Sequence, residues 1–164
     1  MKYKIVEKKD YKKNKKDYIS LIKIMFKNDN NKLANIDEIK NHLDFIFNED
    51  YTNNSFLILQ VENDKLISMI NAFEYDNVNH YWCFFSLFTQ KDYRRNGYGE
   101  KMIKYALKYV KKYDCSKVIS GIESDNIASI ELHKKVGFKY ANCNWNELAD
   151  GFPKNHLGFI YNFE

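Results

Sequence analysis

The sequence predicts an α/β fold, in which one domain of 164 residues is built on a mixed, mostly antiparallel central sheet. Three observations lead to this prediction. Strand-forming runs rich in β-branched and aromatic residues follow one another in the middle of the chain, with only short polar turns between them. Segments with apolar residues at helical spacing lie on both sides of these runs. The length is typical of one domain that buries a large core, so we expect residues 1–164 to fold as a unit.

The first third of the chain is expected to form one strand and two helices. Lys4 to Glu7 is a short strand candidate. Residues 11–27 carry apolar side chains at helical spacing, namely Tyr18, Leu21, Ile22, Met25 and Phe26. The segment NIDEIKNHLDFIF, residues 35–47, repeats this spacing, and Asn35 is placed to cap its first turn.

The middle of the chain is expected to form three strands, SFLILQV at 55–61, KLISMINAFEY at 65–75 and HYWCFFSLFT at 80–89. The turns between them are too short for a crossover between parallel strands, so these strands should run antiparallel.

The remaining segments alternate between helix and strand. Residues 100–112 place apolar side chains on one helix face, and SKVISGI at 116–122 follows as a strand that should run parallel to residues 80–89. A last helix over residues 124–135 ends at Gly137, and strands at 138–145 and 156–163 flank a turn with Gly151 and Pro153. The predicted order is β-α-α-β-β-β-α-β-α-β-β.

Composition narrows the classes of protein. The three cysteines form no C-x-x-C pair, so neither a disulfide framework nor a thiolate metal site is indicated, and we expect no metal. No apolar run approaches the ~20 residues of a membrane span, so we expect a cytoplasmic protein without a membrane partner. The net charge is +4, with lysines gathered near the N-terminus and after the glycine turn at residues 97–99. A nucleic-acid binder would use such lysines, but no zinc-finger or stacking-aromatic pattern accompanies them, so solvated helix faces are the favoured interpretation.

The segment DYRRNGYGEKM, Asp92 to Met102, has the parts of an anion site. It follows a strand, contains Gly97 and Gly99, and opens a helix, where backbone N–H groups and the helix dipole favour negative charge. It lacks the GK[ST] ending of a P-loop. Met102 stands where a dinucleotide-binding turn has its third glycine, so both nucleotide patterns fail.

Two motifs resemble those of the GCN5-related N-acetyltransferases (GNAT family). The acetyl-CoA signature of that family, [R/Q]-x-x-G-x-[G/A], stands here as Arg94 to Gly99. Its following helix carries N-x-x-[A/S]-x-x-L-Y-x-x-x-G-F, and residues 126–138 fit at every marked position except that His133 replaces the tyrosine. The resemblance is sharp over residues 82–138, and it implies the GNAT fold, acetyl-CoA as donor and an N-acetyltransferase activity.

The resemblance also implies which residues bind coenzyme A. Glycine at 97 and 99 lets the backbone approach a pyrophosphate, and Arg94 or Arg95 adds positive charge. Asn126 would hydrogen-bond the pantetheine amides, although a local helix cap would use the same side chain. The full set of expected coenzyme A contacts is Leu87, Phe88, Thr89, Arg94, Arg95, Asn96, Gly97, Tyr98, Gly99, Asn126 and Ser129.

His133 is the departure from the family pattern. The tyrosine of relatives protonates the leaving thiolate, and histidine, with an ordinary pKa of about 6.5, can also act as this general acid. The form LHKKVGF resembles the phosphinothricin-type branch, which acetylates small amino-acid-like amines. The alternative is that His133 only fills space or makes a local hydrogen bond.

The expected reaction is direct attack of a primary amine, from a small molecule or a peptide, on the thioester in a ternary complex. A backbone N–H near residues 87–89, where relatives have a bulge, would hold the oxyanion. Candidate bases are Glu123, Glu74 and His80 in the expected cleft strands, with a water relay as an alternative. A non-catalytic acyl-CoA-binding module remains a rival, and the acceptor and a homodimer are left open.

Overall fold

The computed structural model describes residues 2–23, 35–47, 54–144 and 155–163. In these ranges the order of helices and strands is the predicted one, with two short 3-10 helices (η) in addition. The elements are β1 Lys2–Glu7, α1 Lys8–Ile22, α2 Ile36–Ile46, β2 Ser55–Glu62, β3 Lys65–Asp76, β4 Tyr81–Thr89, η2 Lys91–Tyr93, α3 Tyr98–Val110, η3 Lys111–Tyr113, β5 Lys117–Glu123, α4 Ile127–Val136, β6 Lys139–Asn144 and β7 His156–Asn162.

The strands form a seven-stranded sheet in the order β1-β2-β3-β4-β5-β7-β6. The strands from β1 to β4 are antiparallel neighbours, so the predicted meander is confirmed. The crossover through α3 makes β5 parallel to β4, also as predicted. Only the structure shows that β7 lies between β5 and β6, antiparallel to both.

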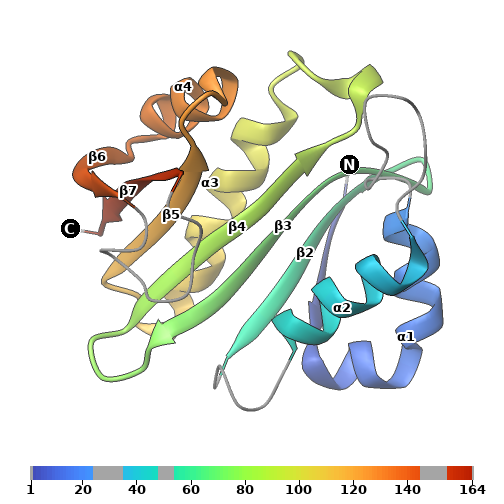
Figure 1. Cartoon of the computed structure of the whole chain (residues 1–164). Helices are drawn as coiled ribbons and strands as arrows, with labels where there is room; N and C mark the ends of the chain where they lie inside the picture. Colours follow the sequence, from blue (N-terminus) through green and yellow to red (C-terminus); the bar gives the residue numbers. More distant parts are fainter. Residues whose placement is uncertain (1, 24–34, 48–53, 145–154, 164) are drawn as a thin grey trace.

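Helices cover both faces of the sheet (Figure 1). α1 and α2 pack on one face, where their buried side chains meet Leu57, Leu59 and Met69 of the sheet. α3 lies on the opposite face, and α4 lies beside α3 and near the C-terminal strands. The order helix layer, sheet, helix layer gives the α/β class predicted from the sequence.

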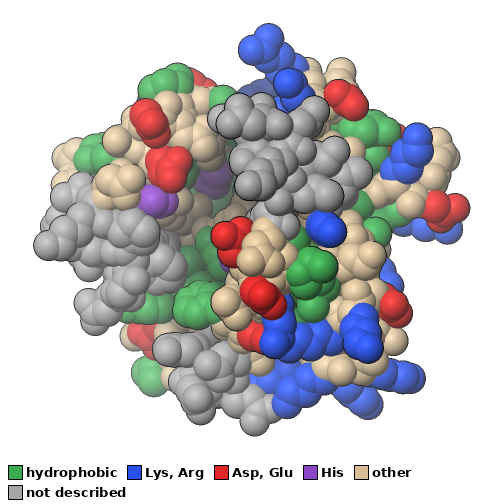
Figure 2. All heavy atoms as spheres, turned by 45° about the vertical axis from the view of Figure 1, so that its right-hand side comes forward, with side chains coloured by type: hydrophobic (Ala, Val, Ile, Leu, Met, Phe, Trp, Pro, Cys, Tyr) green, Lys and Arg blue, Asp and Glu red, His purple; other side chains and the backbone are tan. Residues whose placement is uncertain are grey.

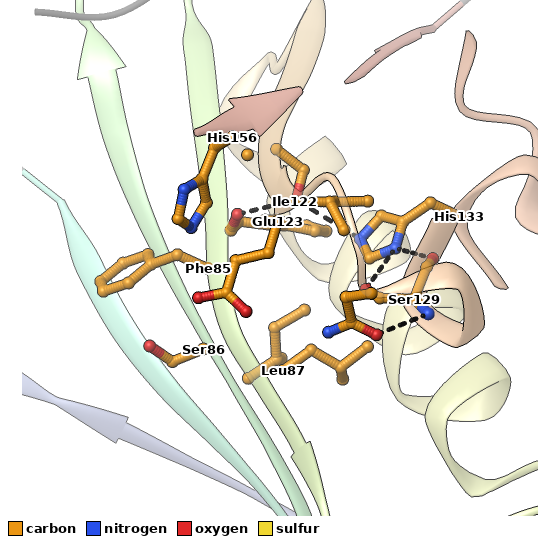
Figure 3. A pocket seen from close by; sticks show the side chains of 13 residues that line it. Phe85, Ser86, Leu87, Ile122, Glu123, Ser129, His133 and His156 are labelled. Atoms are coloured by element: carbon orange, nitrogen blue, oxygen red, sulfur yellow. Dashed lines mark hydrogen bonds between the residues drawn. The ribbon is translucent and has the colours of Figure 1, made fainter. Parts of the chain in front are cut away.

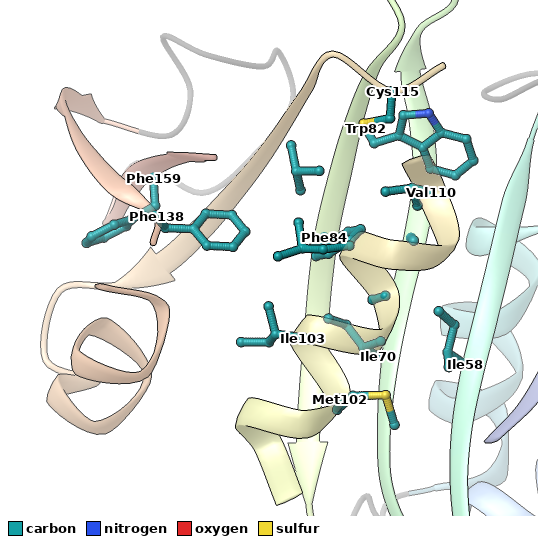
Figure 4. Close-up of a cluster of buried hydrophobic side chains, with 14 of the residues drawn as sticks. Ile58, Ile70, Trp82, Phe84, Met102, Ile103, Val110, Cys115, Phe138 and Phe159 are labelled. Atoms are coloured by element: carbon teal, nitrogen blue, oxygen red, sulfur yellow. The ribbon is translucent and has the colours of Figure 1, made fainter. Parts of the chain in front are cut away.

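The larger core lies between α3 and the sheet. The expected apolar face of α3 is buried throughout, at Met102, Ile103, Ala106, Leu107 and Val110. Figure 4 shows Ile103 beside Phe84 and Ile70. Because α3 is anchored along its whole length, its N-terminus has a fixed position relative to the end of β4.

Three helix starts differ from the prediction, each for a local reason. α1 begins at Lys8, directly after Glu7, and Asn14 leaves helical geometry with φ −124° and ψ 30°. α3 begins at Tyr98 because Gly97, at φ 77°, serves as its N-cap. α4 begins at Ile127 because Oδ1 of Asn126 accepts the Ser129 N–H. The predicted continuation of the first helix to Lys27, Trp145 and the turn with Gly151 and Pro153 lie outside the described residues.

Candidate active site

The central sheet opens between β4 and β5. These parallel neighbours are paired only over residues 81–84 of β4 and 117–120 of β5. Beyond this stretch β5 continues beside β7 to the pair Glu123 and His156, while β4 continues beside β3 to Thr89. The two strands diverge, and Figure 1 shows their arrowheads well apart.

A bulge in β4 lies at this opening. Phe88 pairs with Met69 of β3, whereas Phe85 pairs with Asn71, so β4 has one residue more than β3 in the stretch. Ser86, within the bulge, has a left-handed φ of 51°. The resemblance to acetyltransferases implied a bulge near residues 87–89, and the structure has it at residues 85–88. It interrupts the regular ladder where the sheet opens.

A cavity of about 260 Å³ occupies the opening (Figure 3). It passes between the two strands, so its walls come from several elements that are distant in sequence. These are residues 84–87 of β4, residues 120–123 of β5, Asn126, Ser129 and His133 around α4, His156 of β7 and Ile70 of β3.

The start of α3 lies at the segment where an anion site is expected. Gly97 caps the helix in the left-handed region, and no side chain caps the first turn. The first intrahelical bond runs from the Lys101 N–H to the Gly97 oxygen at 3.0 Å, so the N–H groups before it have no intrahelical acceptor. Among the described residues, none except its chain neighbours would lie within 4 Å of a Cβ added at Gly97, so this position is open. The geometry fits a pyrophosphate bound by backbone donors.

The two glycines have different roles. Gly97 is required because its φ of 77° is unfavourable for other residues. A Cβ at Gly99 would lie 3.0 Å from Cδ2 of Leu132 and 3.7 Å from Oγ1 of Thr89. Gly99 therefore allows α3 to lie close to α4 and to β4. The motif in the sequence indicated another reason for this glycine, the close approach of a pyrophosphate to the backbone.

The side chains of this turn mainly stabilise the turn itself. Nε of Arg94 donates to the Thr89 carbonyl at 3.0 Å, and its guanidinium lies 5.7 Å from the Phe88 ring centroid. Nδ2 of Asn96 donates to the Arg94 carbonyl at 3.2 Å. The Tyr98 hydroxyl donates to Oε2 of Glu62 at 3.0 Å, which links α3 to the end of β2. Arg95 is exposed and at φ 62°, and its side chain makes no hydrogen bond or ion pair with another described residue.

The expected strand contacts fall into two groups. Leu87 lines the cavity. Phe88 and Thr89 instead lie at the end of β4, where Oγ of Ser68 donates to the Phe88 carbonyl at 2.6 Å and lies 3.1 Å from Oγ1 of Thr89. The structure thus brings Leu87 to the opening, while Phe88 and Thr89 border the α3 turn.

Helix α4 brings Asn126, Ser129 and His133 to the cavity, in agreement with their predicted common face. Oδ1 of Asn126 caps the helix, as in the alternative considered above, but the cap leaves Nδ2 to donate elsewhere. The side-chain oxygen of Ser129 lies 3.4 Å from Nδ1 of His133. Asn126 therefore combines a structural role with a position in the cavity wall.

His133 is buried, with 3% of its surface exposed, and two further polar contacts hold it besides that with the Ser129 side chain. Nδ1 lies 2.8 Å from the Ser129 carbonyl oxygen, which only accepts, so Nδ1 carries a proton. Nε2 lies 3.3 Å from Oγ of Ser120. Burial lowers the pKa of His133 below its ordinary 6.5, and the hydrogen bond to Ser129 opposes this shift. The neutral ring with Nε2 as acceptor is therefore the main form near neutral pH.

The other side of the cavity carries Phe85, Ser86, Glu123 and His156, which Figure 3 shows apart from the α4 residues. Glu123 and His156 are register partners on β5 and β7. Of the three candidate bases, Glu123 alone lines this cavity.

Glu74 and His80 lie elsewhere. Oε2 of Glu74 accepts from Nδ2 of Asn54 at 2.7 Å, and Oε1 lies 3.4 Å from Nδ1 of His80. Both residues are near the start of β4, because Glu74 pairs with Trp82, whereas the opening lies beyond Phe84. The expectation that they belong to the cleft is not met.

Four cavity residues had no signal in the sequence: Phe85, Ser86, Ser120 and His156. His156 reaches the site because β7 inserts beside β5, and Ser86 because of the bulge. A serine one residue before Gly121 and a histidine at the start of the last strand belong to no motif, so only strand pairing could have identified them.

No three His, Cys, Asp or Glu side chains within the described ranges gather into a group that could hold a metal ion. None of the helices in the same ranges has the length and apolar character needed to cross a membrane.

Comparisons with known proteins agree with this geometry. Residues 22–138 match the model of the acetyltransferase (GNAT) family. No curated protein matches the sequence. Among solved structures, the chain is similar to an aminoglycoside 6'-acetyltransferase type Ii, with 16% identity, a TM-score of 0.69 and coverage of 99% of this chain and 97% of that chain.

Two further structures share the fold. A spermidine N-acetyltransferase chimera from Vibrio cholerae has 14% identity and a TM-score of 0.67 over 98% of this chain and 92% of that chain. An acetyltransferase from Bacillus anthracis in complex with acetyl coenzyme A has 19% identity and a TM-score of 0.57, over 70% of this chain and 66% of that chain. Identities this low establish the shared fold.

The family model spans well over half of the chain, and it includes the α3 turn as well as the bulged β4 and the α4 face that line the cavity. The residues in these segments fit a donor with a pyrophosphate and a long polar arm. The chain belongs to the GNAT family of acetyltransferases, enzymes that take their acetyl group from acetyl-CoA.

Proposed function

We propose that this acetyltransferase transfers the acetyl group of acetyl-CoA to a primary amine of a small molecule or peptide, by direct attack in a ternary complex. One observation carries the proposal: the cavity lies where the sheet opens, and of its lining residues Leu87 packs toward the α3 core while Phe85 packs toward the core under α1 and α2. A donor and an acceptor that enter from opposite sides can be held in line there, which accounts for a large part of the rate in such reactions.

In this proposal the α3 turn binds the donor's pyrophosphate. The N–H groups that precede Lys101 point away from the helix, and the helix dipole adds to their attraction for an anion. Arg95 is exposed beside them and adds positive charge. Nδ2 of Asn126 and the backbone of Leu87 are placed for the polar groups of the pantetheine arm, since both border the cavity.

The bulge provides the proposed oxyanion site. When the amine nitrogen attacks the thioester carbon, a C–N bond forms and the carbonyl oxygen gains negative charge. A backbone N–H near Ser86 to Phe88, displaced from the regular ladder, is suited to stabilise that charge. The C–S bond then breaks, and the thiolate takes up a proton.

Two side chains of the cavity are proposed for the proton transfers. Glu123 is the one candidate base in the cavity wall, so we assign it the proton that the amine loses, taken up through a water relay and passed on to solvent so that the carboxylate stays ionised. His133 lies on the donor side and is assigned the proton that the thiolate gains. Because burial favours its neutral form, only the protonated fraction of His133 serves as this acid.

The names of two structurally similar enzymes, the aminoglycoside and the spermidine acetyltransferase, both refer to amine acceptors. At such low identity they support the proposal by analogy of fold only.

The direct test measures binding and turnover separately. In titration calorimetry, acetyl-CoA should bind the protein. In thermal unfolding, the same ligand should raise the melting temperature. Release of free thiol should then depend on the presence of a primary amine drawn from a broad panel. Binding without amine-dependent thiol release from any panel member would overturn the proposed N-acetyltransferase function.

A further inference from the structure

The side of the cavity that we propose for the acceptor carries an acidic side chain without a lysine or arginine of the described lining to balance it. Of the described residues that line the cavity, Glu123 is the only acidic one, and none is a lysine or an arginine. Lysines are abundant in the chain, but they gather elsewhere. Figure 2 shows basic side chains mainly over the part that carries α1, whereas the histidine side chains lie on the other part of the same face.

Glu123 is available to a ligand. It is exposed, and within the described ranges its carboxylate has no hydrogen bond or ion pair. Its register partner across β5 and β7 is His156, whose Nδ1 lies 3.0 Å from Oδ1 of Asn155. The carboxylate therefore keeps its full capacity to accept hydrogen bonds from an ammonium group.

Phe85 forms an aromatic wall beside it. Its ring centroid lies 5.4 Å from that of Phe73, 6.0 Å from that of His42 and 6.4 Å from that of Phe45, all in edge-on arrangements. Three edge-on neighbours hold the ring in position. The Phe85 ring and the Glu123 carboxylate both line this cavity, and each of them attracts a cation.

We infer that the acceptor is a diamine or polyamine without a carboxylate next to its charged groups. One amine reacts, and a second, still protonated, pairs with Glu123 and lies against Phe85. A carboxylate on the acceptor would face Glu123 with no lysine or arginine of the described lining to balance it. This inference rests on the proposed amine acetylation and deepens it, and it disfavours the amino-acid-like acceptors suggested by the phosphinothricin-type motif.

Cadaverine and lysine form a matched test, because they share the same chain and primary amine and differ by one carboxylate. With saturating acetyl-CoA and the full-length protein, kcat/KM for cadaverine should exceed that for lysine by about tenfold or more. Lysine used as well as cadaverine would overturn the inference.

Glu123→Gln tests which residue makes the distinction. If Glu123 binds the second ammonium group, the cadaverine-to-lysine ratio should fall toward one, mainly through a higher KM for cadaverine. A loss of general base function would slow both amines alike, so it cancels in the ratio. The matched control is Glu131→Gln, since Glu131 is exposed on α4 and pairs with Lys134 at 3.1 Å, outside the cavity. A ratio unchanged by Glu123→Gln would overturn the assignment.

Binding distinguishes this inference from the proposed function. If no amine releases thiol, the acetylation proposal fails, but the preference of the cavity can still be measured. Cadaverine should bind the CoA complex more tightly than lysine in calorimetry, and Glu123→Gln should remove the difference. Equal binding of the two amines would overturn the inference in that case.

Discussion

His133 shows how burial and a hydrogen bond favour one protonation state of a side chain. The Ser129 carbonyl requires a proton on Nδ1, and burial disfavours a second proton on Nε2. Oγ of Ser120 has a single hydrogen and two acceptors within reach, Nε2 of His133 at 3.3 Å and the Phe84 carbonyl at 3.0 Å. In the neutral state Nε2 of the ring accepts a proton more readily than Nδ1 donates one. A tyrosine at the same position would instead carry a hydroxyl proton to donate.

This environment yields a prediction for residue 133. His133→Phe should slow transfer by about tenfold or more and leave acetyl-CoA affinity nearly unchanged, because the acid is lost while the donor contacts stay. His133→Tyr should restore part of the rate, since a phenol keeps its proton up to a pH of about 10. Steady-state rates and calorimetry measure the two effects.

The pH dependence distinguishes catalysis from packing at this position. The ratio of the native rate to the Tyr variant's rate should fall as the pH rises above the lowered pKa of His133. A large loss of acetyl-CoA affinity in the Phe variant would assign His133 to donor binding instead. Thermal unfolding of both variants serves as the control, because His133 packs edge-on against Phe138 at 5.1 Å.

At the scale of elements, the start of α3 depends on one residue conformation. Gly97 directs the chain from the end of η2 into the helix, and its left-handed φ orients the first-turn N–H groups toward open space. The helix is fixed from behind by its buried apolar face. The anion site is therefore a property of the whole element, formed where a packed helix meets a glycine turn.

Gly97→Ala should lower the free energy of unfolding by about 1 kcal/mol, since an L residue is strained at this φ. It should also weaken acetyl-CoA binding, because relief of the strain would turn the N–H groups away. Gly97→Asn is the matched control: asparagine tolerates the left-handed region and should show smaller losses in both denaturant unfolding and calorimetry. If Ala and Asn behave alike, the role assigned to φ is wrong.

For the whole molecule, the buried His133 and the partly buried His42, on opposite sides of the sheet, link stability to pH. Burial lowers the pKa of His42 and that of His133 below the ordinary 6.5. Above pH 6.5 neither the folded nor the unfolded chain protonates these rings, so they add no pH dependence. Below it the unfolded chain binds protons that the folded chain does not, so stability falls toward the folded-state pKa values.

We therefore expect the free energy of unfolding to decrease between pH 6.5 and 5, by up to about 1.4 kcal/mol per pH unit for each histidine. Urea titrations at several pH values measure this slope, and His42→Gln or His133→Gln should each reduce it. Asp44 does not interfere. Burial acts to raise its pKa, but hydrogen bonds from Lys15 and Tyr11 outweigh this and keep the pKa below 3.8, so its effect appears only in stronger acid. An unchanged slope in both variants would contradict the prediction.

Local patterns were sufficient for much of the fold. The apolar spacing of α3, the short turns of the meander and the crossover to β5 depend on neighbouring residues and on chirality rules, and the structure confirms them. Helix starts were less accurate, because Gly97 acts through its backbone angle and Asn126 through a single hydrogen bond.

The sequence by itself determined the motifs that we propose for donor binding. The turn with Gly97 and the face with Asn126, Ser129 and His133 are each contiguous, so their spacing alone places them together. Only the tertiary structure decided the part of the cavity that we propose for the acceptor. Phe85, Glu123 and His156 meet there because β4 bulges, β5 separates from it and β7 inserts beside β5. Pairing between distant strands depends on the packing of the whole sheet, and no local pattern encodes it.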